Sequence, residues 1–362
     1  MTRTLACCLL FLAACGDDDA PLDDAGRGRD SSVGVDASFD AARGDDARVA
    51  TDASTDAFVG VDAGPPPVCP PGSESLVLEL GGVSLTRVEG VPILDGFADG
   101  WSIVEGPVFF DGDLLVSHFQ GGNTPASRVY RVASGGVSVA FSNAGTNGLA
   151  LGPDGMLYGA SHVMGAIVRF DPSRPAAAPT PVVAGYEGAR FNTPNDLVFR
   201  SDGQIYLSDP DYQAPASRPQ AAERAYHVDL DGVVRVIEGA PSKPNGVALS
   251  LDERTLFVAG SNGLRRFDLA ENGAVASGPT NVDAVSGGLD GIGRDCAGNL
   301  YLTGGGQVVV LDRELRRVGA LSAPGATNVA FGGEDRRTLF VTTLGDARGL
   351  YSARLNVPGL PD

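Results

Sequence analysis

The chain has 362 residues, 50 of them glycine, and a formal net charge of −18. Thirteen Asp and only four Arg lie between residues 16 and 64, so this stretch carries half of the net charge. An acidic chain without a basic patch argues against nucleic acid and anionic surfaces as partners.

The first 15 residues, MTRTLACCLLFLAAC, are typical of an export signal. One Arg precedes an apolar stretch that is too short to span a bilayer, and small residues precede Cys15. The end of the segment resembles the lipobox of bacterial lipoproteins, although an ordinary secretory signal is the alternative. The lipobox predicts that Cys15 is acylated and that the exported protein is anchored in the bacterial cell envelope, at the outer membrane, in the periplasm or at the cell surface. This lipid anchor is the only membrane contact that the sequence predicts.

Residues 16–72 are predicted to form a disordered linker. Asp and Ala repeat along it with almost no aromatic residue, and GPPPVCPPG ends it. Such a composition cannot bury enough apolar surface to offset the entropy of ordering. A calcium-binding acidic tract is the alternative to a solvated tether, and the proline run indicates a stiff spacer.

Residues 73–362 are predicted to be all-β. Short runs of Val, Ile, Leu, Phe and Tyr alternate with Gly-containing turns, and no sustained 3.6-residue apolar period is present. One pattern recurs six times: a polar residue, an apolar strand, an Asp/Gly turn and a second apolar strand. The copies begin at Glu105, Asn147, Asn195, Asn245, Asp290 and Thr327.

The spacing of these copies is typical of four-stranded propeller blades. The sequence therefore predicts a six-bladed β-propeller of antiparallel four-stranded blades. The last copy is followed by only one further strand, so a strand from residues 76–90 is predicted to complete that blade and close the ring.

The first strand of each propeller blade lines the central channel, so the six residues that open the copies are predicted to meet at one end of it. Their side chains offer oxygen donors, two of them carboxylates, and none is a thiol or an imidazole. Such a donor set suits Ca²⁺, with Mg²⁺, Mn²⁺ or Zn²⁺ as other candidates. The alternative is that Asn-Gly and Asp-Gly only form hairpin turns, although Glu105 is a poor turn former.

Several stretches together resemble the gluconolactonase and senescence-marker-protein (regucalcin) family of six-bladed propellers. They include EGPVFF, TPNDLVFRSDGQIYLSDP, KPNGVALSLDERTLFVA and DGIGRDCAGNLYLT, and the resemblance covers residues 95–362. It implies a divalent cation and the hydrolysis of lactones. The implied metal ligands are Glu105, Asn195, Asn245 and Asp290, with Asn147 near the substrate.

The implied chemistry assigns a role to each of these side chains. Asp290 is the candidate general base, or in a variant mechanism the nucleophile. Glu105 would hold charge on the metal, and Asn147 could donate a hydrogen bond to the developing oxyanion. His162 follows the second-blade hairpin and is predicted to contact the substrate at the channel rim, whereas His118 and His227 are predicted to be structural or surface residues.

The substrate is predicted to be a small lactone or ester, bound by a monomer. Family members tend to carry a Glu and an Arg pair after the second-blade hairpin, where this chain has Ser161 and residues 163–166 reading VMGA. A less polar lactone than gluconolactone is therefore plausible. Two rival functions are a non-catalytic propeller that binds a ligand or a cell-surface partner with a structural Ca²⁺, and an organophosphate or ester hydrolase.

Cys69 and Cys296 remain after removal of the signal. Export permits a disulfide between them, but two unrelated thiols are slightly favoured. Cys296 is not a predicted metal ligand.

Overall fold

The structure is a computed structural model that describes residues 69–91, 102–120, 127–134 and 136–360. All of these described residues belong to one compact unit. The predicted signal, the acylated Cys15 and most of the predicted linker lie outside the described residues. No helix within the described ranges is long and apolar enough to cross a membrane.

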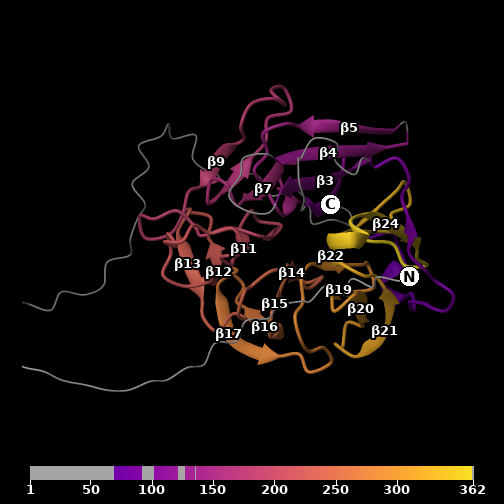
Figure 1. Ribbon diagram of the computed structural model, residues 1–362. Helices are drawn as coiled ribbons and strands as arrows, with labels where there is room; N and C mark the ends of the chain where they lie inside the picture. Colours follow the sequence, from indigo (N-terminus) through magenta and orange to yellow (C-terminus); the bar gives the residue numbers. More distant parts are fainter. Residues whose placement is uncertain (1–68, 92–101, 121–126, 135, 361–362) are drawn as a thin grey trace, which may run out of the picture. The chain divides into compact units, whose positions relative to one another are not determined.

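The described residues form six four-stranded antiparallel sheets arranged as blades around a channel, as predicted (Figure 1). Blade 1 contains β2 (Ser102–Phe110), β3 (Asp113–Gln120), β4 (Ser127–Ala133) and β5 (Gly136–Phe141). Blade 2 contains β6 (Leu149–Leu151), β7 (Leu157–Ser161), β8 (Ala166–Arg169) and β9 (Thr180–Val183). Blade 3 contains β10 (Leu197–Phe199), β11 (Ile205–Asp209), β12 (Arg224–Val228) and β13 (Val234–Ile237).

The second half of the ring repeats this order. Blade 4 contains β14 (Val247–Leu249), β15 (Thr255–Gly260), β16 (Gly263–Leu269) and β17 (Val275–Asn281). Blade 5 contains β18 (Ile292–Arg294), β19 (Leu300–Gly304), β20 (Gln307–Leu311) and β21 (Arg317–Ser322). Blade 6 contains β22 (Ala326–Gly332), β23 (Thr338–Thr343), β24 (Gly349–Arg354) and β1 (Thr86–Arg87). The described helices are two short 3₁₀ turns, η1 (Ser73–Ser75) and η2 (Gly345–Ala347).

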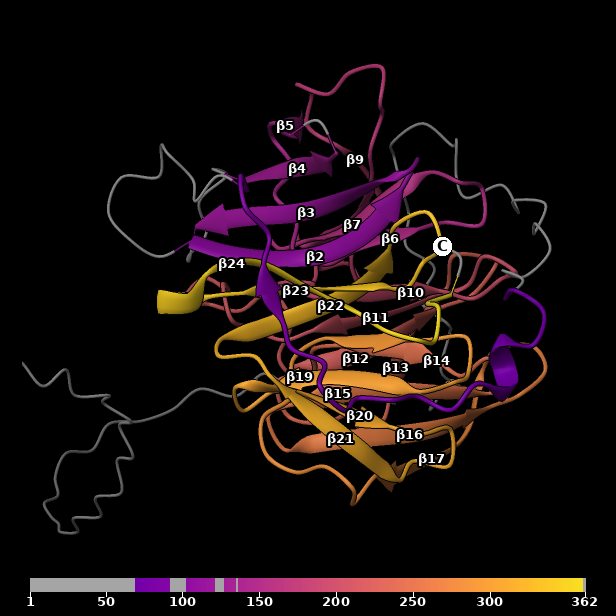
Figure 2. The same ribbon diagram turned by 90° about the vertical axis from the view of Figure 1, so that its right-hand side faces the viewer.

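The N-terminal strand β1 closes the ring as predicted. It pairs antiparallel with β24, with Thr86 opposite Ser352 and Arg87 opposite Tyr351, and Figure 2 shows the indigo strand beside β24. Residues Leu80 and Leu85 of the same segment pack against the apolar cluster of blades 5 and 6. The fourth strand of the last blade is therefore supplied by the segment that precedes the first blade, so the two ends of the propeller share one sheet.

Each pair of neighbouring blades encloses one apolar cluster. The second strands are the most deeply buried; every residue of β7 and of β11, for example, is buried. A strand that is covered on both faces is expected to read as a continuous apolar run, and this explains stretches such as Ile205–Leu207.

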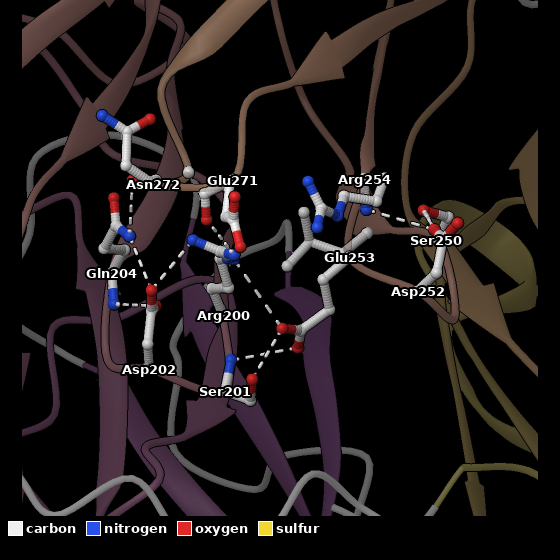
Figure 3. Close-up of polar contacts among 12 residues, drawn as sticks. Arg200, Ser201, Asp202, Gln204, Ser250, Asp252, Glu253, Arg254, Glu271 and Asn272 are labelled. Carbon is white, nitrogen blue, oxygen red and sulfur yellow. Dashed lines mark hydrogen bonds and ion pairs between the residues drawn. The ribbon is translucent and has the colours of Figure 1, made fainter.

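A polar cluster docks the β10–β11 hairpin onto blade 4 (Figure 3). Ser201 donates from its backbone N and from Oγ to the Glu253 carboxylate, at 3.0 and 2.6 Å. Arg200 donates to Asp202 at 2.9 Å and to the Glu271 carbonyl at 2.7 Å. Arg200 Nε also lies 3.8 Å from Glu253 Oε2, so opposite charges are paired where the two hairpins meet.

Cys69 and Cys296 form a disulfide, with a Cα–Cα distance of 5.6 Å. This corrects the expectation of two unrelated thiols. Cys296 is fully buried and lies in the turn between β18 and β19. The bridge fixes the segment that carries β1 to blade 5, so it reinforces the closure of the ring.

Removal of this disulfide should destabilise the propeller. The bridge joins residues 227 positions apart, and opening such a long loop in a native protein typically costs about 2–5 kcal/mol. We expect Cys69→Ser to lower the free energy of unfolding by this amount in urea denaturation. Reduced wild-type protein is the matched control and should unfold at the same urea midpoint as the variant. A variant with the midpoint of the oxidised wild-type protein would show that the bridge adds nothing to closure.

Candidate functional site

The six predicted ring positions occupy equivalent places in the six blades. Asn147, Asn195, Asn245 and Asp290 each lie two residues before the first strand of their blade, and Glu105 and Thr327 lie within β2 and β22. Asp290 is partly exposed, whereas the other five side chains are at most 5% exposed.

Backbone hydrogen bonds connect these positions from blade to blade. Gly148 donates to the Asn195 carbonyl at 2.7 Å, Gly246 to the Asp290 carbonyl at 2.8 Å and Gly291 to the Thr327 carbonyl at 2.8 Å. Thr327 Oγ1 donates to the Val104 carbonyl at 2.8 Å, which joins blade 6 to blade 1. The opening residues of the blades therefore lie at one end of one channel.

Glycine follows four of the ring residues because neighbouring first strands approach too closely for a side chain. A Cβ on Gly148 would lie 2.7 Å from the Asn195 carbonyl oxygen, and a Cβ on Gly246 would lie 2.5 Å from that of Asp290. Neither these two glycines nor Gly291 has a positive φ, as a two-residue type I′ hairpin turn would require. The turn interpretation of these dipeptides is therefore wrong.

Hydroxyl side chains on the second strands support the ring in four blades. Thr303 Oγ1 accepts from Gly291 N at 2.8 Å and donates to the Thr327 carbonyl at 2.6 Å. Ser208 Oγ accepts from Asp196 N at 3.0 Å, and Thr342 Oγ1 accepts from Asn328 N at 3.1 Å. In blade 1, the Ser117 hydroxyl instead bonds the hydroxyl of Thr146, the residue before Asn147, at 3.2 Å. The sequence analysis missed these residues, although a Ser or Thr near the end of a second strand in four repeats was a usable signal.

Three acidic side chains meet at the ring and perturb one another. Burial, followed by the negative charges of Asp290 and Asp196, raises the pKa of Glu105 well above its usual value. Burial and then Asp196 raise the pKa of Asp290 to about 7, against a hydrogen bond from Asn245 that lowers it. Burial also raises the pKa of Asp196 to about 7, although the backbone N–H groups of Leu197 and Val247 donate to it.

Asp196 is a further site residue that the sequence analysis did not single out. It stands where four other blades have glycine, and its carboxylate lies over Gly148. The Asn-Asp pair at 195–196, compared with Asn-Gly in blades 2 and 4, was the signal that could have identified it.

The residues of the ring fit a hard divalent cation. Asn147 Oδ1 and Asp290 Oδ1 are buried without a hydrogen-bond partner among the described residues. A cation would satisfy such oxygens and offset the repulsion between the acids. In the described ranges no group of three or more His, Cys, Asp or Glu is arranged to hold a metal, so a ligand set here would have to include the Asn amides.

A pocket of about 270 Å³ opens beside the ring. Tyr212, Asn245, Ser261, Leu289, Asp290 and Leu344 line it, together with glycines and Ala326. A larger cavity of about 400 Å³ occupies the channel on the other side of the ring, where the side chains of the first strands are mainly apolar. The smaller pocket is the candidate site, because it contains Asn245 and Asp290.

A family match covers most of this propeller. The sequence model of the SMP-30/Gluconolactonase/LRE-like region matches residues 103–345. The chain belongs to this family. Its membership confirms the resemblance seen in the sequence.

Two relatives in sequence are lactonases. A gluconolactonase of Zymomonas mobilis is 32% identical over 223 residues, which are 56% of this chain and 62% of that protein. A pentonolactonase of Haloferax volcanii is 31% identical over 160 residues, which are 42% of this chain and 53% of that protein. The chain therefore matches less than two thirds of the length of either relative.

Solved structures of the family share the fold. A gluconolactonase from Xanthomonas campestris is 26% identical, with a TM-score of 0.60 over 82% of this chain and 97% of that protein. Regucalcin from Agrobacterium tumefaciens, described as a calcium-binding protein, is 23% identical, with a TM-score of 0.56 over 71% of this chain and 91% of that protein.

The two predicted substrate contacts of this family member differ in their surroundings. Asn147 is 3% exposed and lies in the ring, with its amide oxygen unpaired among the described residues. His162 is 0% exposed, and its ring lies 4.6 Å from that of Phe119. His162 therefore does not face an open rim as expected, because the end of β7 is covered by neighbouring strands.

All three histidines should remain neutral in mildly acidic solution. Burial lowers the pKa of His118 to about 3, and that of His162 and His227 to about 4. An unfolded chain takes up these protons near pH 6.5, so the unfolded state binds more protons between about pH 6.5 and 4. This contribution lowers the free energy of unfolding as the pH falls through that window. In an NMR titration we expect no histidine ring signal to shift above pH 5; a ring that titrates near 6.5 would contradict the burial.

An alanine at Gly246 should disrupt the contact between blades 4 and 5. The added methyl group would clash with the Asp290 carbonyl, and overpacking of this kind costs about 1–3 kcal/mol. Urea denaturation of Gly246→Ala should show this loss. Gly81→Ala is the control, because a Cβ at Gly81 has no neighbour within 4 Å; equal stability of the two variants would mean that the strands are not in close contact.

Proposed function

We propose that this protein is a metal-dependent lactone hydrolase that uses a divalent cation in the central channel. The observation that carries the proposal is the ring of buried carboxylates and amides, with two unpaired oxygens, beside a small open pocket. The names of the relatives support lactones as the substrate class.

Four side chains would hold the cation: Glu105, Asn195, Asn245 and Asp290. We propose Ca²⁺, since carboxylate and amide oxygens are its usual ligands. When bound, the cation polarises the lactone carbonyl and makes a nearby water acidic enough to attack at neutral pH.

Asp290 is the proposed general base, because it lines the pocket and is flanked by other acids. It removes a proton from the attacking water, whose oxygen forms the new bond to the carbonyl carbon. The bond from that carbon to the ring oxygen then breaks, the ring oxygen takes up a proton, and a hydroxy acid leaves. Asn147 would donate a hydrogen bond to the oxyanion that develops on the carbonyl.

We propose further that the protein is exported and held in the cell envelope by the acylated Cys15. The disulfide between Cys69 and Cys296 supports export, because such bonds persist in oxidising compartments.

The function is tested by acid release from a panel of sugar and aliphatic lactones, with calcium and with chelator. We expect chelation to abolish turnover and Asp290→Asn to lower kcat by about 10²–10⁴-fold, the usual contribution of a general base. Asp231→Asn is the matched control, since Asp231 is exposed in the turn between β12 and β13. Turnover that survives both chelator and Asp290→Asn would reject the mechanism, and calcium binding without turnover would favour a binding propeller.

A further inference from the structure

One wall of the pocket comes from an unusually long connection. Residues 210–223 join β11 to β12, whereas the corresponding connections in blades 2, 4, 5 and 6 span two to five residues. This connection carries Tyr212, which lines the pocket and is 48% exposed. A large aromatic side chain in an open position beside Asp290 is available to contact a ligand.

Charged contacts fix the segment that carries Tyr212. The Lys243 ammonium group lies 5.4 Å from the centre of the Tyr212 ring and pairs with Asp211 and, at 3.1 Å, with Glu223. Arg218 binds Asp211 at 2.9 Å. Lys243 is held by two carboxylates, so its charge is balanced where it lies against the aromatic ring.

The polar end of Tyr212 is directed to the ring of ligands. Tyr212, Asn245 and Asp290 line the same pocket, and the phenol lies close to both of these ring residues. The aromatic ring therefore forms a wall of the pocket next to Asn245 and Asp290.

The described lining of the pocket contains no Lys or Arg. Leu289, Leu344 and Ala326 supply apolar surface, and Ser261 supplies one hydroxyl group. Lys243 lies behind the Tyr212 ring but is paired with Asp211 and Glu223, so this lining offers no unpaired side-chain cation to a negatively charged substituent.

We propose that Tyr212 determines substrate choice at this site and selects uncharged lactones with an apolar ring face over anionic ones. The inference rests on the proposed lactone hydrolysis. An aromatic face packs well against C–H groups of a small ring, and contact of this size is worth about tenfold or more in discrimination.

The test compares kcat/KM for three probes: δ-valerolactone, D-glucono-1,5-lactone and its 6-phosphate. Wild-type enzyme should prefer δ-valerolactone and turn over the phosphate most slowly. Tyr212→Ala should raise KM for δ-valerolactone about tenfold and leave KM for the phosphate nearly unchanged. Tyr212→Phe should keep the apolar preference, because it keeps the aromatic face. Leu230→Ala is the control, since Leu230 is also exposed but lies outside the pocket.

A binding measurement separates this inference from the proposed function. δ-Valerolactam resists hydrolysis, and its Kd for the calcium-loaded protein can be measured by calorimetry whether or not lactones are turned over. We expect Tyr212→Ala, but not Leu230→Ala, to weaken binding about tenfold. An unchanged Kd, a preference for the phosphate, or an equal effect of Tyr212→Ala on all three lactones would overturn the role of Tyr212. Absence of all turnover with the expected loss of lactam binding would instead reject only the hydrolase.

Discussion

The close approach of the six first strands around the channel is the constraint on which the structure depends. At Gly148 and Gly246 the backbones of neighbouring blades come so near that even a methyl group would overlap with a carbonyl oxygen. This approach brings the residue before each glycine to the same end of the channel. The geometry of the site is therefore a direct result of how tightly the blades converge.

The same convergence brings acidic side chains together, and other parts of the fold must offset the unfavourable electrostatic free energy that results. Glu105, Asp196 and Asp290 are held together in a buried setting, where each disfavours the charge of the others. They cannot move apart, because apolar clusters fill every interface between blades, and β1 and the disulfide close the ring. Acidic groups kept close in this way are a favourable arrangement for a cation and an unfavourable one without it.

Much of this architecture could be predicted from the sequence, because it is repetitive. Six copies of one hairpin pattern specify six blades, and a missing last strand specifies closure by residues near the N-terminus. The register of the ring residues followed from the same pattern, and the structure confirms that register. The bond between Cys69 and Cys296 has no comparable signal, since the two positions are 227 residues apart and share no local pattern.

Sequence analysis missed or misplaced features that occur only once in the chain and are not part of the repeated pattern. Tyr212 lies in a connection without any periodicity, so only the folded structure shows that it lines the same pocket as Asn245. His162 follows a strand that was expected to end at an open rim, but neighbouring residues cover it. Packing between distant segments decides both cases, and a single sequence does not contain that information in a readable form.

The departures from the repeat give the site its chemistry. A ring with Asn-Gly in every blade would present six neutral amides, and such a ring would attract a divalent cation weakly. Glu105 and Asp290 replace two of these amides with carboxylates, and Asp196 replaces a glycine with a third. The long β11–β12 connection then adds an aromatic wall on one side only, next to Asp290. The scaffold is thus nearly symmetric, but its two sides differ. In the proposed function, a substrate on Tyr212 would present its ester group to the acidic side of the ring, where Asp290 is the proposed base.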